Sequence, residues 1–461
     1  MGEGRKNRTI TLSIEDLAFG GEGVGRVDGQ VHFIAGAFPG EQVTAEIQNG
    51  RKRWQRARLI SILEKSPERI PPRCSHTGAC GGCVYQELAY EAQLEAKARQ
   101  VRENLIRIAG VRPPELKPPL AAPEPFHYRN KMEFSFSPRS WDPSGLPEHP
   151  APGPALGLHV RGRFDAIFDI VDCALTTPEV NALVAFVRDE ARSRGIAGYH
   201  GRDLTGVLRH LLVRSSRGSG EWLVALIVHH EVPGLREIAE LARERFPQIA
   251  GFLLWINAGL ATVARAEEEI LLYGRDRIVE RVCDLEFELS ASSFFQTNSA
   301  AAEGLLTTIR EMARPARTLL DLYCGVGTLG LGLAGSCERL IGIESIPSAV
   351  ADAGRNAKRN GIHHATFETA SVEGWIPRAR EIRPEVVICD PPRAGMHPKA
   401  LAGLASVSPP TIIYVSCNPA TLARDLCDLA ADGYVAERMR ILDLFPHTPH
   451  VETVVLLTRG Q

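Results

Sequence analysis

Four short apolar segments in the C-terminal part of the chain place the strongest constraint on its fold. Each is four or five residues long and rich in Leu, Ile or Val, and stretches with helical character separate them; they span 318–322, 339–343, 386–389 and 411–415. Strands that are apolar throughout and alternate with helices belong to parallel sheets that helices cover. The chain from about residue 290 onward is therefore expected to form a doubly wound α/β domain.

The first of these segments runs into a glycine turn, Asp321-Leu-Tyr-Cys-Gly-Val-Gly-Thr328. Two glycines allow the backbone to come close to a ligand at the start of the next helix. Glu344 ends the following strand, where a carboxylate can accept hydrogen bonds from ribose hydroxyls. Dinucleotide-binding loops carry a third glycine, which is missing here at the expected place. The Asp-x-x-x-Gly-x-Gly form resembles S-adenosylmethionine-dependent methyltransferases, and a nucleotide is the alternative ligand.

Two more strand ends carry reactive groups. Asp390-Pro-Pro-Arg393 follows the third segment and projects a carboxylate at the ligand-binding edge of the sheet. Cys417 follows the fourth segment, and an Asn-Pro pair breaks the strand directly after it. A thiol beside a cofactor pocket suggests covalent catalysis, and an inert buried thiol is the alternative. Amino-methylating enzymes carry an aromatic residue after such prolines, so Arg393 argues against chemistry on an exocyclic amine.

The N-terminal segment, 8–66, alternates apolar and polar residues in short stretches between glycine turns, which is typical of a small β-barrel. Its last long strand contains a basic run, 51–58, with five cations around Trp54. Cations can neutralise phosphates and an indole can stack on a base, so this run suggests RNA binding. A charged, solvated strand edge is the alternative. The net charge of −2 excludes a polycationic chain as a whole.

The middle of the chain is expected to form a mixed α/β domain, because β and helical patterns alternate from residue 158 to about 289. This gives three expected domains, 1–68, 69–289 and 290–461. Residues 138–157 are rich in Pro and Gly and are expected to form a loop insertion, either a determinant of target choice or a plain surface loop.

A helix is predicted over 88–108, with an apolar face of Leu94, Val101, Leu105 and Ile108. The segment that contains it, 87–112, is a candidate to pack on the catalytic domain.

Three of the ten cysteines fall within ten residues, at Cys74, Cys80 and Cys83. In a large cytosolic protein such a cluster binds metal more often than it forms disulfides. Zinc and iron–sulfur clusters both take thiolate ligands, and the spacing alone does not separate them.

No apolar run reaches the roughly 18 residues that a membrane helix needs, and the charged N-terminus lacks the apolar core of a secretory signal. We therefore expect a cytoplasmic enzyme, a monomer, with no membrane partner.

Five motifs, in this order along the chain, resemble the RNA uracil-5 methyltransferases, which make 5-methyluridine in 23S rRNA and tRNA. They are Phe294-Phe-Gln-Thr-Asn298, Asp321-Leu-Tyr-Cys-Gly-Val-Gly327, Asp390-Pro-Pro-Arg393, Ser416-Cys-Asn-Pro419 and His450-Val-Glu-Thr453. The N-terminal barrel is similar to the TRAM domain of many members, an RNA-binding, OB-like fold. The three clustered cysteines together with the distant Cys173 resemble the 4Fe-4S site of the family's rRNA branch.

The resemblance implies a role for each matching residue. Cys417 would attack carbon 6 of uracil, and Glu452 would remove the proton from carbon 5 after methylation. The residues implied to contact S-adenosylmethionine or the uracil edge are Gln296, Tyr323, Gly325, Thr328, Glu344, Ser371 and Asp390. Thr328 stands where many members carry Asn. The iron–sulfur ligands would be Cys74, Cys80, Cys83 and Cys173.

The resemblance favours RNA as the partner, and rRNA over tRNA. A tRNA uridine as target and a non-catalytic RNA-binding assembly factor are the alternatives. Methylation of cytosine carbon 5 also uses a cysteine, but such enzymes usually carry Pro-Cys after the acidic residue, which Asp390-Pro-Pro lacks.

Overall fold

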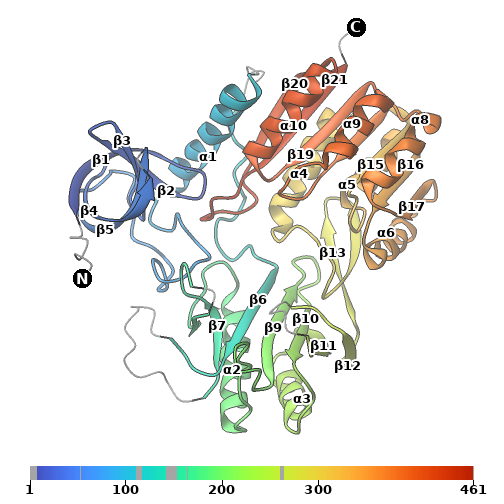
Figure 1. The fold of residues 1–461 in the computed structure, drawn as a ribbon. Helices are drawn as coiled ribbons and strands as arrows, with labels where there is room; N and C mark the ends of the chain where they lie inside the picture. Colours follow the sequence, from blue (N-terminus) through green and yellow to red (C-terminus); the bar gives the residue numbers. More distant parts are fainter. Residues whose placement is uncertain are drawn as a thin grey trace.

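The computed structural model describes residues 8–51, 53–110, 117–141, 153–163, 165–259 and 264–459. Figure 1 shows three parts: a blue barrel near the N-terminus, a green sheet with two helices, and a larger yellow-to-red sheet covered by helices. None of the helices in the described part of the chain is long and apolar enough to cross a lipid bilayer. The central part of the predicted 138–157 insertion, residues 142–152, lies outside the described residues.

The N-terminal part is a closed barrel, as its alternating pattern predicts. Its strands are β1 (Thr9–Leu17), β2 (Glu22–Val27), β3 (Gln30–Ala35), β4 (Gln42–Arg51) and β5 (Trp54–Glu64). Every second residue of β1 is buried, and Ile10, Leu12 and Ile14 form the barrel core with Ile34 and Val43. The parallel pairing of β3 with β5 closes the barrel.

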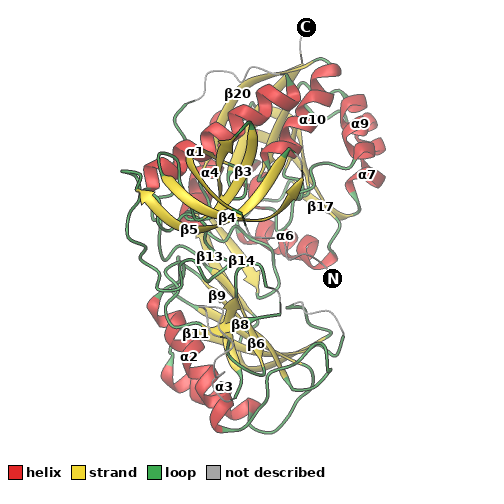
Figure 2. Cartoon of the chain, turned by 60° about the vertical axis from the view of Figure 1, so that its left-hand side comes forward, coloured by secondary structure: helices red, strands yellow, loops and turns green. Residues whose placement is uncertain are grey.

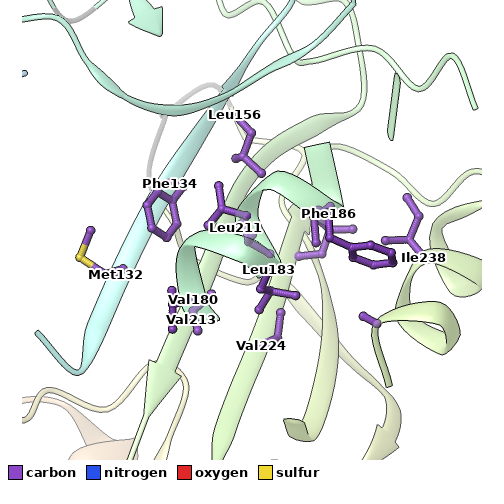
Figure 3. Close-up of a cluster of buried hydrophobic side chains, with 14 of the residues drawn as sticks. Met132, Phe134, Leu156, Val180, Leu183, Phe186, Leu211, Val213, Val224 and Ile238 are labelled. Atoms are coloured by element: carbon purple, nitrogen blue, oxygen red, sulfur yellow. The ribbon is translucent and has the colours of Figure 1, made fainter. Parts of the chain in front are cut away.

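The central part is a seven-stranded sheet with the order β12-β11-β10-β9-β6-β7-β8. Its strands are β6 (Lys131–Ser137), β7 (Ala155–His159), β8 (Ile167–Asp169), β9 (Leu208–Ser215), β10 (Trp222–Val228), β11 (Ile249–Ile256) and β12 (Glu268–Gly274). Helices α2 (Pro178–Ser193) and α3 (Leu235–Arg245) pack on one face of it. Figure 3 shows Phe134 and Leu211 of the sheet lying toward Leu183 and Phe186 of α2.

A two-stranded hairpin, β13 (Arg277–Val282) and β14 (Leu285–Ser290), joins the central sheet to the C-terminal sheet. Ile278 packs with Leu212 and Trp255 of the central sheet, whereas Phe287 packs with the core of the C-terminal domain. Figure 2 places this hairpin between the two larger parts.

The C-terminal sheet has the order β17-β16-β15-β18-β19-β21-β20. Its strands are β15 (Ala316–Leu322), β16 (Cys337–Glu344), β17 (Ala365–Thr369), β18 (Val386–Cys389), β19 (Thr411–Ser416), β20 (Tyr434–Leu442) and β21 (Glu452–Arg459). The first five are parallel, and they contain all four apolar segments of the prediction. The strand order reverses at β15, next to β18, and ligands bind at such a switch point in open α/β sheets. The expected doubly wound fold is confirmed.

Helices cover both faces of this sheet (Figure 1). They are α4 (Ser299–Met312), α5 (Thr328–Gly332), α6 (Pro347–Arg359), α7 (Val372–Trp375), α8 (Ala379–Ile382), α9 (Pro398–Val407) and α10 (Pro419–Ala431), with short 3-10 turns at Ala334–Ser336 and Ile376–Arg378. The core contains β-strand residues such as Leu320, Ile341 and Val387.

Helix α1 (Tyr90–Asn104) packs on the C-terminal domain through Val101 and Leu105, which lie in the same core as Leu422 and Leu426 of α10. The predicted apolar face fails at Ile108, whose side chain is exposed. The reason is a π-helical turn, Leu105–Ala109, at the end of α1, because its wider turn breaks the 3.6-residue period.

Candidate active site

The glycine turn lies at the switch point of the sheet. Strand β15 ends at Leu322, the backbone of Tyr323 takes a positive φ of 64°, and α5 begins at Thr328. At Gly327, φ is 87° and an added Cβ would lie 3.0 Å from the side chain of Leu331, so a larger residue would be strained. The space beside Gly325 is open, which leaves room for a ligand against the backbone.

Glu344, at the end of β16, lies beside this turn. Its Oε2 accepts a hydrogen bond from the backbone N–H of Gly325 at 3.2 Å. Its Oε1 accepts from the N–H groups of Ser345 and Ile346 at 2.7 and 2.9 Å, which fixes the carboxylate. A carboxylate held this way has lone pairs left for ribose hydroxyls, so the residues present fit the adenosine part of S-adenosylmethionine.

Asp321 has a structural part in this turn. Its Oδ2 accepts from the N–H of Gly330 in α5 at 2.9 Å, and the side chain is fully buried. Burial raises the pKa of Asp321 to about 8, with the nearby charges of Asp390 and Glu344 adding to the rise. A Cβ on Gly330 would lie 2.6 Å from that same oxygen, so this glycine admits the close packing of helix on strand.

The other predicted cofactor residues lie on two neighbouring loops. Ser371 is the N-cap of α7, with its side chain accepting from Gly374, and it follows the end of β17 beside Glu344. Gln296 lies in the loop before α4, where its carbonyl oxygen accepts from Asn130 Nδ2 at 3.0 Å. Hydrogen bonds to the Ser371 side chain and to the Gln296 carbonyl oxygen thus fix both loops.

Cys417 lies between β19 and α10, at the C-terminal edge of the sheet. Asn418 caps α10 by accepting from the N–H of Ala420, and its Nδ2 donates to the carbonyl of Arg393 at 3.0 Å. Ser416 at the end of β19 pairs with Thr453 of the neighbouring antiparallel strand β21. One position beyond this pair, Cys417 follows β19 and Glu452 begins β21, so the two residues are neighbours across the strands. The structure therefore brings together the two residues predicted for catalysis, although they are 35 positions apart in the sequence.

Asp390, Cys417 and Glu452 influence each other's ionisation. Burial, together with the charges of Glu452 and Asp390, raises the pKa of Cys417 to about 11, whereas Arg393 opposes this rise. Burial also raises the pKa of Asp390 to about 7. The pKa of the fully buried Glu452 is raised by burial and by Asp390, again against Arg393. Two carboxyl groups and a thiol are thus gathered here, and the cation Arg393 opposes their effect on one another.

The position of Arg393 is fixed by His450. Arg393 Nη2 lies 3.0 Å from His450 Nε2. Burial lowers the pKa of His450 to about 4, and Arg393 lowers it further, so this imidazole is neutral near pH 7 and its Nε2 can accept from the guanidinium. Sequence reasoning missed this pair, because neither residue type is diagnostic and 57 positions separate them.

Phe294 is a second residue whose importance the sequence did not reveal. Its side chain is 68% exposed, unlike that of Phe295, which is buried with Phe287. An exposed ring beside Gln296 is suited to stacking on a base. The motif Phe294-Phe-Gln-Thr-Asn298 marks this segment in the sequence, but it does not show which of the two phenylalanines faces outward.

The four predicted metal ligands line one cavity of about 440 Å³, together with Arg129, Lys131 and Phe294; they are Cys74, Cys80, Cys83 and Cys173. Burial raises the pKa of Cys83 to about 12 and that of Cys173 to about 11, and neighbouring thiols of the set add to both. Within the described residues, no group of three or more His, Cys, Asp or Glu side chains is placed to hold a metal ion. The four thiols share a cavity, and the expected metal centre stays a prediction.

Comparisons with known proteins show similarity along the whole chain. The family model described as tRNA (uracil-5-)-methyltransferase matches residues 215–460, and that of the TRAM domain matches residues 5–60. A protein of Chlorobaculum tepidum described as an uncharacterized RNA methyltransferase is 37% identical over 99% of this chain and 98% of its own. One of Clostridium acetobutylicum with the same description is also 37% identical, again over 99% and 98%.

A solved structure is similar over nearly the whole chain. It is the crystal structure of the Pyrococcus abyssi tRNA (uracil-54, C5)-methyltransferase in complex with S-adenosyl-L-homocysteine. The TM-score is 0.76 at 28% identity, and the match covers 97% of this chain and 100% of the other.

Proposed function

The chain belongs to the RNA uracil-5 methyltransferases, which use S-adenosylmethionine, and from this premise we propose that Cys417 and Glu452 carry the reaction on a uridine of 23S rRNA. The observation that carries the proposal is that Cys417, Glu452 and Asp390 gather at the edge of the sheet where the glycine turn lies, close enough to shift one another's pKa. S-adenosylmethionine, when bound, supplies the methyl group as part of a sulfonium ion.

The proposed reaction proceeds through a covalent adduct. The Cys417 thiolate adds to carbon 6 of uracil, and the electron pair of the 5,6 double bond moves into an enolate that makes carbon 5 nucleophilic. After carbon 5 has gained the methyl group, Glu452 removes the remaining carbon 5 proton. The double bond re-forms, the carbon–sulfur bond breaks, and the electron pair returns to Cys417 as thiolate. The proton is then on Glu452 and passes to solvent.

Burial gives Glu452 a suitable basicity for this step. A buried carboxylate with a raised pKa is a stronger base near neutral pH than an exposed one. The same burial holds Cys417 in its protonated form in the resting enzyme, because its pKa is about 11. We propose that Arg393 supplies the activation, since its charge favours the Cys417 thiolate and His450 holds it in place.

The TRAM-like barrel and the four cysteines favour rRNA, since the resemblance associates this combination with the rRNA branch. The second candidate is a tRNA uridine, which the description of the matching family and of the Pyrococcus abyssi enzyme supports. Mapping 5-methyluridine in rRNA and tRNA from cells with and without the gene decides between them. Loss of one modified uridine in 23S rRNA supports the first candidate, and loss in tRNA alone supports the second.

We also propose that Cys74, Cys80, Cys83 and Cys173 hold a 4Fe-4S cluster. Four thiols line one cavity, and 4Fe-4S clusters are held by four cysteine thiolates. Methyl transfer needs no electron, so the cluster would be structural, joining the 74–83 loop to the segment of Cys173.

A further inference from the structure

A second cavity, of about 1020 Å³, lies in the central domain and has no part in the chemistry described above. Side chains at its wall, such as Ser135 and His210, alternate along their strands with Phe134 and Leu211, which pack against α2. The cavity therefore opens from the face of the sheet opposite to the helices.

The lining of this second cavity is cationic. It contains four arginines, Arg139, Arg163, Arg202 and Arg209, against two carboxylates. Both carboxylates have partners: Asp165 pairs with Arg163 at 3.0 Å, and Asp203 lies 2.7 Å from His200 Nδ1. Arg139 and Arg202 are exposed at the mouth. An excess of guanidinium groups favours a ligand with phosphate groups.

Two aromatic side chains of the cavity have guanidinium groups placed over their rings. Arg139 and Arg163 lie over the ring of Trp141, at 4.7 and 4.5 Å from its centroid. Arg209 lies 4.6 Å from the centroid of Tyr199, whose other neighbour is His229, stacked at 5.2 Å with an interplanar angle of 14°. Planar groups of this kind form platforms on which nucleic-acid bases stack.

The floor of the cavity can bond to the edge of a base. Ser135 Oγ lies 3.4 Å from His159 Nε2 and 3.3 Å from His210 Nδ1. Burial lowers the pKa of His210 to about 4, so the imidazole is neutral near pH 7 and offers one donor and one acceptor. A hydroxyl and the neutral imidazole of His210 match the mixed donor and acceptor edge of a base.

Strand β6 runs from this cavity to the loop of residues 294–298, which contains Phe294 and Gln296. Its first residues, Lys131 to Glu133, line the cysteine cavity beside Phe294, and its last, Ser135 to Ser137, line the second cavity. Just before the strand, the backbone of Arg129 forms a β-bridge with Asn298 of that loop. A strand of seven residues spans about 20 Å, so the two sites are held a few nucleotides apart along a rigid element.

We propose that the second cavity binds one nucleotide of the RNA substrate outside the target uridine, with its base on the guanidinium–indole stack at Trp141 and its phosphates at Arg139 and Arg202. The inference rests on the proposed function, because it takes RNA as the substrate. Exposed arginines at the mouth suit a polymer, since a charged backbone gains affinity by releasing its counterions. Arg139 and Trp141 belong to the described start of the 138–157 insertion, which gives that insertion a role in target choice.

The test measures binding of the full chain to labelled rRNA and tRNA fractions from cells that lack the gene, without S-adenosylmethionine. For the double variant Arg139→Glu with Arg202→Glu, we expect affinity about tenfold weaker or more. The slope of log affinity against log salt should be shallower by about 1.4 to 1.8, for two lost phosphate contacts. Trp141→Ala should weaken binding about fivefold or more with the slope unchanged, because stacking releases no counterions.

The matched control carries the same charge change elsewhere. Arg236→Glu with Arg243→Glu changes two arginines of α3, on the helix-covered face of the sheet and outside the cavity lining. This variant should bind within about twofold of wild type. Binding of the cavity variants equal to that of the control would overturn the inference, with thermal melting showing that all variants are folded. Binding is measured without methyl transfer, so the two proposals can fail independently. If only the proposed reaction is wrong, 5-methyluridine is missing but the cavity variants still bind RNA more weakly than the control.

Discussion

The ammonium group of Lys97 donates to Oδ1 of Asp443 across 2.7 Å, and both side chains are only 1% exposed. Lys97 also donates to the carbonyl oxygen of Phe445 at 3.2 Å, and the N–H of Phe445 donates to the same Asp443 oxygen at 3.0 Å. Burial lowers the pKa of Lys97, against the opposing effect of Asp443. This pair ties α1 to the segment that leads to Glu452, the proposed base.

Removing one partner of this pair is expected to destabilise the protein strongly. Lys97→Met leaves the Asp443 carboxylate buried without its cation, which costs about 3–5 kcal/mol. The double variant Lys97→Met with Asp443→Leu should recover much of that loss, because no charge is left buried. The measurement is urea unfolding. As control, Arg107→Ala removes an exposed pair with Glu103 and should cost about 0.5 kcal/mol or less. Equal losses in Lys97→Met and Arg107→Ala would contradict this account.

Helix α1 also shows where the sequence stops being informative. The barrel and the doubly wound sheet follow from local patterns, because alternation and apolar runs record which faces of a strand are buried. Buried polar residues leave no such record. Lys97 and Gln93 lie on the buried side of α1 but have the pattern of a solvent face, and Gln93 Nε2 donates to the carbonyl of Leu88 at 2.8 Å.

The candidate site also contains some residues whose placement the sequence predicts and others whose placement it does not. Cys417, Asp390 and Glu344 stand at the ends of parallel strands, which meet at one edge of the sheet, so the sequence predicts their proximity. Glu452 begins the antiparallel strand β21, and only the resemblance to the family indicated it. Arg393 and His450 need a contact across 57 positions that no local pattern encodes. The second cavity likewise needs three separate loops to converge.

Replacing Arg393 should slow alkylation of Cys417. Arg393→Gln removes the cation that favours the thiolate, so the pKa of Cys417 should rise further above about 11. At pH 9, we expect the rate of reaction of Cys417 with iodoacetamide to fall about threefold or more, followed by mass spectrometry of its peptide. Cys427, exposed on α10, is the internal control and should react equally in both proteins. An unchanged rate at Cys417 would exclude Arg393 as the activating group.

Asp390 predicts a pH dependence of stability. Its pKa is about 7 in the folded protein and near its ordinary value of 3.8 when unfolded. The folded state therefore holds more protons between these values, and stability is lost as pH rises from about 4 to about 7. Asp390→Asn removes the ionisable carboxyl group and with it this loss of stability. The unfolding free energy of the variant relative to wild type should therefore rise with pH across that window. A difference that stays constant from pH 4 to 7 would refute the raised pKa.

The four cysteines give a spectroscopic prediction. Cys173→Ser removes the ligand that lies far from the 74–83 loop, and we expect loss of visible absorbance and of bound iron and sulfide in protein purified without oxygen. Cys337→Ser is the matched control, because that thiol lies outside the cysteine cavity and should leave the iron content unchanged. Stoichiometric zinc without visible absorbance in wild type would show that the site holds zinc instead.

The covalent adduct is tested most directly by RNA that contains 5-fluorouridine. After methylation, fluorine at carbon 5 cannot leave as a proton does, so Glu452 cannot complete the reaction and the RNA stays bonded to Cys417. With S-adenosylmethionine present, we expect a complex that survives denaturing gels and whose RNA-linked peptide contains Cys417, with none in Cys417→Ser. A Cys417→Ser variant that still forms 5-methyluridine in normal RNA at the wild-type rate would contradict the account.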